Sequence, residues 1–117
     1  MPPRRLRVLA YPETRIWSTA RCLEHDLLTS ARTAELAVEA LVRMIRAHVA
    51  YDCRHNRLPL SAFGPAPRVY RQAFRNATRS WVLDDPTWLP GTQMVIDVAF
   101  ATQQPAVRPF SEAVRIA

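Results

Sequence analysis

The sequence has 117 residues, of which 49% are hydrophobic and 22% are charged. A soluble domain with one apolar core, over residues 1–117, is therefore expected, and a disordered chain is excluded. The net charge is +6, with arginine as the sole basic residue type besides histidine. Nucleic acid, an acidic protein and a negative membrane surface are all allowed partners.

The two cysteines exclude a disulfide framework, and no stretch reaches the roughly 20 apolar residues of a membrane span. We therefore expect a cytoplasmic protein.

The first part of the chain predicts a β-hairpin. Residues 6–11 are rich in strand-forming side chains, a polar turn follows at 12–15, and an extended pattern resumes at Ile16. Along this second arm the side chains alternate between two faces. One face has the small set Ser18, Ala20 and Cys22, whereas the other has Thr19, Arg21 and Leu23. The small set predicts a face that a helix covers closely.

A long helix is the next clear element, after a short strand predicted at 27–30. Thr33 is the expected N-cap, and Glu35 lies in the first turn, where its charge suits the helix dipole. The helical period then predicts an apolar stripe of Ala37, Ala40, Leu41, Met44, Ile45, His48 and Val49. The pattern fades after Cys53, and Pro59 excludes its continuation.

The second half of the chain is rich in proline. Residues 58–67 form a proline-punctuated connector, and an aromatic pattern predicts a second helix over 68–80. Residues 81–90 are expected to be irregular. The β-branched run 93–101 predicts a strand with Met94, Ile96, Val98 and Phe100 on one face. An extended tail is expected over 102–117.

The stretch from Trp17 to Ile45 resembles the signature of HicB-like antitoxin proteins. The residues that carry the resemblance combine a tryptophan, a Cys-Leu-Glu-x-Asp strand end and a capped helix: Trp17, Cys22, Leu23, Glu24, Asp26, Thr33, Glu35, Ala37, Leu41 and Ile45. Ala31 stands where that family prefers glycine, and Leu36 replaces its second glutamate. The pair Ala66-Pro67 before an aromatic helix also resembles a small single-domain subgroup.

The resemblance implies an α+β fold and a binding function. The fold would be a β-β-β-α-β domain, similar to a reduced RNase H fold, with a small antiparallel sheet and one long packing helix. The core would comprise 4–56 and 92–101, and 57–91 would be a proline-rich insertion containing a second helix. The function would be to bind and neutralise a small HicA-type toxin that cleaves mRNA, without enzymatic activity or a cofactor. Residues 92–117 lack the pattern of a helix-turn-helix, so DNA binding of that kind is not expected.

Catalytic and metal sites are weighed against structural roles. Glu24 and Asp26 could hold a metal in a nuclease, but two acidic residues at a strand end more often make local hydrogen bonds. Cysteine and histidine residues at 22, 25, 53 and 55 are zinc-ligand types whose spacing does not fit a structural site. A buried apolar thiol is the preferred account of Cys22. We also interpret His48 as a packed side chain rather than a catalytic base, and predict neither a catalytic nor a metal site.

Partner-binding residues are predicted in the second half. Arg68, Arg71, Arg75 and Arg79 recur at helical spacing and would form one basic ridge. The ridge could follow phosphates, which makes a basic nucleic-acid-binding module the alternative function, or it could be a solvated face. Trp81 and Trp88 lie in the predicted irregular chain and are candidate anchors for a partner or for self-association into a homo-oligomer.

Overall fold

The protein is described from a computed structural model, which covers the backbone of residues 4–77, 79–84 and 94–105. Side chains are described over 4–77, at Val82 and over 94–105. Five strands and two helices follow one another in the order β1 (Arg4–Pro12), β2 (Ser18–Cys22), β3 (Leu28–Ala31), α1 (Ala34–Arg54), α2 (Arg68–Asn76), β4 (Arg79–Asp84) and β5 (Met94–Phe100). The fold is α+β, as predicted.

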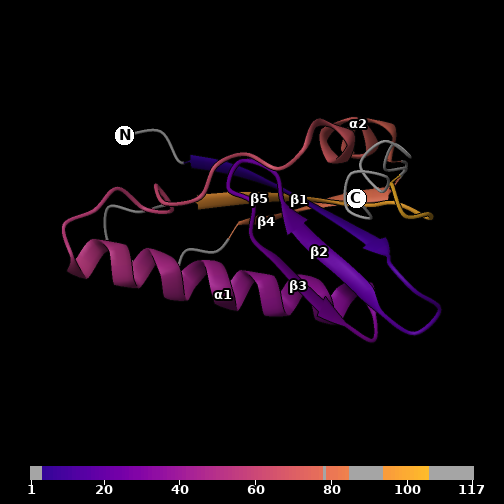
Figure 1. The fold of residues 1–117 in the computed structure, drawn as a ribbon, viewed down its shortest axis with the longest axis horizontal. Helices are drawn as coiled ribbons and strands as arrows, with labels where there is room; N and C mark the ends of the chain where they lie inside the picture. Colours follow the sequence, from indigo (N-terminus) through magenta and orange to yellow (C-terminus); the bar gives the residue numbers. More distant parts are fainter. Residues whose placement is uncertain (1–3, 78, 85–93, 106–117) are drawn as a thin grey trace, which may run out of the picture.

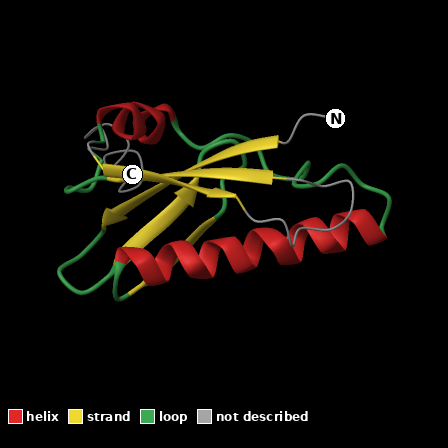
Figure 2. Cartoon of the chain, turned by 180° about the vertical axis from the view of Figure 1, so that it is seen from behind, coloured by secondary structure: helices red, strands yellow, loops and turns green. Residues whose placement is uncertain are grey.

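The strands form one mixed sheet between the two helices. The strand order is β3-β2-β1-β5-β4, so β1 is the central strand, with β2 and β5 on either side of it. The long helix α1 lies along one face of the sheet, and α2 lies over one end of the opposite face (Figure 1; Figure 2 shows the same layers from behind). Neither described helix combines the length and the apolar character that crossing a membrane requires.

The predicted hairpin is confirmed by the antiparallel pairing of β1 with β2. Its alternation is confirmed as well, because Ala20 and Cys22 are fully buried in the core beneath α1. The predicted short strand is β3, which pairs with β2 at the edge of the sheet. A tight interface with the helix follows from the small side chains on this face.

Helix α1 begins where its sequence predicts. The Thr33 side chain accepts a hydrogen bond from the Leu36 N–H, and Glu35 lies in the first turn. The helix buries a stripe against the sheet, comprising Ala37, Val38, Leu41, Ile45 and Val49. At least four of the strand β5 side chains complete this core: Met94, Ile96, Val98 and Phe100.

The sheet departs from the prediction in its strand directions. A small antiparallel sheet was expected, but β5 pairs with β1 in parallel, with Arg4 opposite Met94 and Ala10 opposite Phe100. On its other side, β5 pairs antiparallel with β4. Local sequence patterns indicate a strand but not its direction, which depends on how the chain returns to the sheet.

A second correction concerns the segment after α2. The predicted helix over 68–80 ends early, at Asn76, and Ala77 is extended. Residues 81–84, expected to be irregular, belong to strand β4, which also contains Arg79. The run from Ser80 to Leu83 has β-forming residues that gain backbone hydrogen bonds by pairing with the edge of β5. The rest of the predicted irregular chain, 85–90, and most of the expected tail lie outside the described residues.

Candidate functional site

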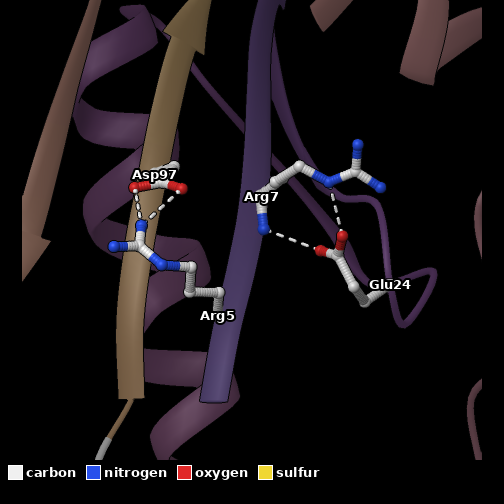
Figure 3. A network of polar contacts seen from close by, with 4 residues as sticks. All are labelled: Arg5, Arg7, Glu24 and Asp97. Carbon is white, nitrogen blue, oxygen red and sulfur yellow. Dashed lines mark hydrogen bonds and ion pairs between the residues drawn. The ribbon is translucent and has the colours of Figure 1, made fainter. Parts of the chain in front are cut away.

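The face of the sheet opposite α1 carries a row of ion pairs on its uncovered part. Strand β1 contributes Arg5 and Arg7, β5 contributes Asp97, and the turn after β2 contributes Glu24 (Figure 3). The Nη1 of Arg5 lies 3.1 Å from both carboxylate oxygens of Asp97. The Nε of Arg7 lies 2.5 Å from the Oε2 of Glu24. The side chains of the two arginines therefore extend to opposite sides of β1, Arg5 toward β5 and Arg7 toward the turn after β2.

Glu24 also extends the backbone ladder between β1 and β2. The Leu23 N–H donates to the Arg7 carbonyl at 2.8 Å, which continues the pairing one residue beyond the end of β2. The Arg7 N–H then donates to Oε1 of Glu24 at 2.6 Å, so the carboxylate takes the place of a backbone acceptor. Both Glu24 oxygens are thus engaged by a single residue, which fixes the orientation of the Arg7 side chain.

The Arg7 guanidinium is held on a second side by α2. Its central carbon lies 5.9 Å from the centre of the Phe74 ring. This is within the range of a cation–π contact. The contacts of Arg7 with described residues use its backbone N–H, its Nε and the Phe74 ring, while its two terminal nitrogens project away from Glu24 (Figure 3). Arg7 is therefore fixed in place, with its terminal nitrogens directed away from the carboxylate that holds its Nε.

A separate cluster attaches α2 to the sheet. The Arg21 guanidinium lies 4.1 Å from the centre of the Tyr70 ring, and its Nη1 donates to Asp26 at 2.9 Å. The rings of Tyr70 and Tyr11 stack at 5.6 Å between centres. Burial, which disfavours the phenolate, raises the pKa of Tyr11 to about 12, although the neighbouring Arg21 acts in the opposite direction. The cluster is packed and largely buried, so its role is structural.

The acidic residues considered for catalysis face arginines rather than one another. Glu24, Asp26 and Asp97 each lie within 3.1 Å of a different guanidinium. Among the described residues, no group of three or more histidine, cysteine or acidic side chains is placed to hold a metal ion. A two-metal nuclease requires several carboxylates around one point, and these three residues do not form such a set. Ion pairing is the role that the structure gives Glu24 and Asp26.

The cysteine and histidine residues weighed as zinc ligands are engaged elsewhere. Cys22 is fully buried in the core, and burial raises the pKa of its thiol to about 11. The His25 ring lies between Arg4 and the Phe63 carbonyl, each at 2.9 Å. The His55 ring stacks on Tyr51 at the end of α1, 4.1 Å between centres. The preferred account of Cys22 as a buried apolar thiol is therefore confirmed.

His48 is also engaged in packing. Its ring meets Phe63 edge-on, with 4.9 Å between the two ring centres, and the side chain is half-buried. This contact joins α1 to the connector between the two helices. The interpretation of His48 as a packed side chain agrees with this position.

Three of the four arginines of the predicted ridge lie together on α2. Arg68 and Arg75 are exposed and Arg71 is half-buried. The ridge is not continuous to Arg79, which is on β4 rather than on the helix. The side chains of Arg79 and Trp81 and the whole of Trp88 lie outside the described part of the structure.

The residues of the sequence signature divide between core and surface. Cys22, Leu23, Ala37 and Leu41 are fully buried, and Thr33 caps α1. Trp17 is 43% exposed, and Ile16 beside it is 64% exposed. The end of the β1–β2 hairpin therefore presents two adjacent large apolar side chains.

Sequence reasoning missed the residues that organise the face opposite α1. The alternation along 16–23 placed Arg21 on this face, but no local signal indicated that two tyrosines from distant segments would enclose it. No local signal singled out Arg7 either. Its link to Glu24 follows from the hairpin register, in which Val8 pairs with Cys22. Comparison of the chain with protein-family models, with curated proteins and with solved structures finds no match.

Proposed function

We propose that this chain is a non-enzymatic, HicB-like binding protein that neutralises a small HicA-type mRNA-cleaving toxin in the cytoplasm. The observation that carries the proposal is the return of β5 to the centre of the sheet, beside β1. Together with the hairpin, β3 and the capped helix α1, this return gives the β-β-β-α-β arrangement that the sequence resemblance implies. In this proposal, α2 and β4 belong to an insertion between the helix and the returning strand.

The use of the acidic side chains supports a binding role over a nuclease role. Glu24, Asp26 and Asp97 are each paired with an arginine, so a metal would have to compete with a guanidinium at every one of them. A protein that acts by occupying another protein's surface needs no such chemistry. It needs an exposed region that suits the partner.

The hairpin end is the surface that best suits a toxin of this kind. A toxin that binds mRNA is expected to be basic, and an arginine-rich surface would repel it. Ile16 and Trp17 instead offer uncharged contact area, and exposed tryptophans are frequent anchors in protein interfaces. The proposed toxin contact is therefore the hairpin end, with Trp17 at its centre.

The test is co-expression with a small HicA-type toxin. The protein should relieve the growth arrest that the toxin causes, and the two should copurify at high salt. Trp17→Ala should weaken both effects at least tenfold. Leu58→Ala is the matched control, because Leu58 is 78% exposed and follows the far end of α1. If the wild type does not relieve the growth arrest, the proposed function is wrong. If Trp17→Ala relieves it as well as the wild type does, the hairpin end is not the toxin contact.

A further inference from the structure

Arg7 of β1 meets the arginine-bearing helix α2 on the structure. The Arg7 guanidinium lies against Phe74 of α2, and Phe74 is flanked on the same helix by Arg71, three residues before it, and Arg75, directly after it. Helical geometry places Arg68, Arg71 and Arg75 on one side of α2, within about 60° of one another, because successive residues are separated by about 100°. Phe74 borders this side, so Arg7 extends the helical arginines onto the sheet.

We propose that Arg7, Arg68, Arg71 and Arg75 form a binding site for the phosphodiester backbone of a nucleic acid. This site is separate from the toxin contact proposed above. The four residues come from β1 and α2 and are defined here as the α2 arginine surface. Helix α2, which carries three of them, lies on the side of the sheet opposite α1 (Figure 1).

The α2 arginines have no described carboxylate partner, which favours a site for anions. No described carboxylate lies within 4.0 Å of a nitrogen of Arg68, Arg71 or Arg75, in contrast to Arg5, Arg7 and Arg21. Arg7 is paired with Glu24 through its Nε, and its terminal nitrogens point away from that carboxylate (Figure 3). A guanidinium held by a carboxylate and an aromatic ring loses little side-chain entropy when it binds a further oxyanion. Arg7 is therefore the ordered member of the surface.

The spacing of the helical arginines favours a phosphate backbone over an acidic peptide. Arg68, Arg71 and Arg75 are separated by three and four residues, which places their Cα atoms about 4.5 and 6 Å apart along the helix axis. A nucleic acid strand carries one charge per step, at about 3.4 Å along a stacked strand, so the ridge spans about three steps. An acidic peptide would need a run of carboxylates with a matching period. Arginine's planar fork also pairs with two phosphate oxygens at once.

Binding is tested by fluorescence anisotropy with labelled 12-nucleotide single-stranded RNA, the same DNA sequence and a 12-base-pair DNA duplex, each over a series of salt concentrations. The three probes separate single strands from duplex as the source of the phosphate. The wild type should bind at least one probe, with affinity that falls steeply as salt rises. The double variant Arg71→Ala/Arg75→Ala should reduce the affinity at least tenfold and lower the salt slope by about two.

The matched control is Arg43→Ala/Arg54→Ala, which removes the same charge from exposed positions on α1. It should change affinity less than threefold. Equal losses in both double variants would mean that net charge alone drives binding, which would overturn the site. Stronger competition by poly-glutamate than by RNA of equal charge would also overturn it, in favour of an acidic protein partner.

A second variant tests whether the fixed position of Arg7 contributes to binding, by changing Glu24, the residue that orients it. Glu24→Gln adds one unit of net positive charge while removing the carboxylate that orients Arg7. Binding governed by net charge would become tighter, whereas a site that depends on a fixed Arg7 should bind at least threefold more weakly. Circular dichroism on the same samples establishes that the variant is folded. A folded Glu24→Gln variant with tighter binding would remove Arg7 from the site.

Discussion

The backbone N–H of Leu60 donates a 2.7 Å hydrogen bond to Oδ2 of Asp52, in the last turn of α1. Asp52 is 6% exposed, and Leu60 is fully buried with a φ of 64°. A carboxylate near the C-terminus of a helix is opposed by the helix dipole. The hydrogen bond to the Leu60 N–H therefore offsets the unfavourable position of the Asp52 carboxylate. The same bond fixes the chain where it leaves the helix.

Replacing Asp52 with alanine should lower the free energy of unfolding by about 2 kcal/mol, because a buried N–H is left without its charged acceptor. Asp52→Asn keeps an acceptor oxygen and should cost less. Urea denaturation measures both. Glu39→Ala, an exposed acidic position on the same helix, is the control and should stay within about 0.5 kcal/mol of the wild type. Equal stability of Asp52→Ala and Glu39→Ala would refute this role.

Leu60 should respond unusually to glycine. A left-handed backbone costs a residue with a Cβ atom about 1–2 kcal/mol, and glycine does not pay this cost. Leu60→Ala should be destabilised by about 2–4 kcal/mol through the loss of buried side-chain volume. Leu60→Gly loses one more carbon atom but should be at least as stable as Leu60→Ala in the same denaturation experiment. Ala50 within α1 is the control. There glycine should be less stable than alanine, so Ala50→Gly should be less stable than the wild type. A glycine variant at 60 that is clearly less stable than the alanine variant contradicts the strained backbone.

Tyr70 should control whether α2 stays on the sheet. It is the buried residue of this helix, and it contacts both Arg21 and Tyr11. Tyr70→Ala should increase amide hydrogen exchange over 68–76 by at least tenfold, while β1 and β5 stay protected. Gln72→Ala, at an exposed position on α2, should leave exchange unchanged. Uniform loss of protection in Tyr70→Ala would show instead that the helix and the sheet unfold together.

The raised pKa of Tyr11 makes a prediction at alkaline pH. Its folded pKa is about 12 against an ordinary 10.0, so the folded state holds the phenolic proton more strongly than the unfolded state does. This contribution to stability is complete below pH 10 and is lost as the pH rises through about 12. Among the three tyrosines, one should titrate near pH 12 in the tyrosinate absorbance, and Tyr11→Phe should remove that transition. Its persistence in Tyr11→Phe would assign it to another tyrosine.

The two cysteines should differ in reactivity. Cys22 is fully buried with a pKa raised to about 11, whereas Cys53 is half-buried on α1. At pH 8 a thiol reagent should label one site in the folded protein, and Cys53→Ser should abolish the labelling. Above pH 9 the ionisation of Cys22 should begin to favour unfolding, because its folded pKa lies above its ordinary 9.0. Rapid labelling of folded Cys53→Ser would show that Cys22 is accessible.

Elements fixed by short-range chemistry were predictable from the sequence. Helix α1 begins at Ala34 because Thr33 supplies the cap and the apolar stripe has a helical period. The β1–β2 hairpin and the presence of a strand at β5 follow from alternation and from β-branched residues. In each case, residues within a few positions of one another determine the structure.

Features that depend on distant partners were not predictable. Strand β4 forms because its β-forming residues pair with the edge of β5, and that partner is not visible in the local sequence. The parallel direction of β5 beside β1 depends on the path of the whole chain. Arg21 is enclosed by Tyr11 and Tyr70, which come from a strand before it and a helix after it. The meeting of Arg7 with Phe74 has the same origin, so the α2 arginine surface emerges only in three dimensions.

The parallel pairing at the centre of the sheet also constrains how the chain reaches its native state. Arg5 and Asp97 bond across that pair although 92 positions separate them. During synthesis, β1, β2, β3 and α1 leave the ribosome before β5, the strand that completes their core. Contacts of such long range slow folding. The apolar side chains of β1 and α1 that contact β5 must therefore remain uncovered until β5 has been made, and a nascent chain arrested before Met94 should be a client for chaperones.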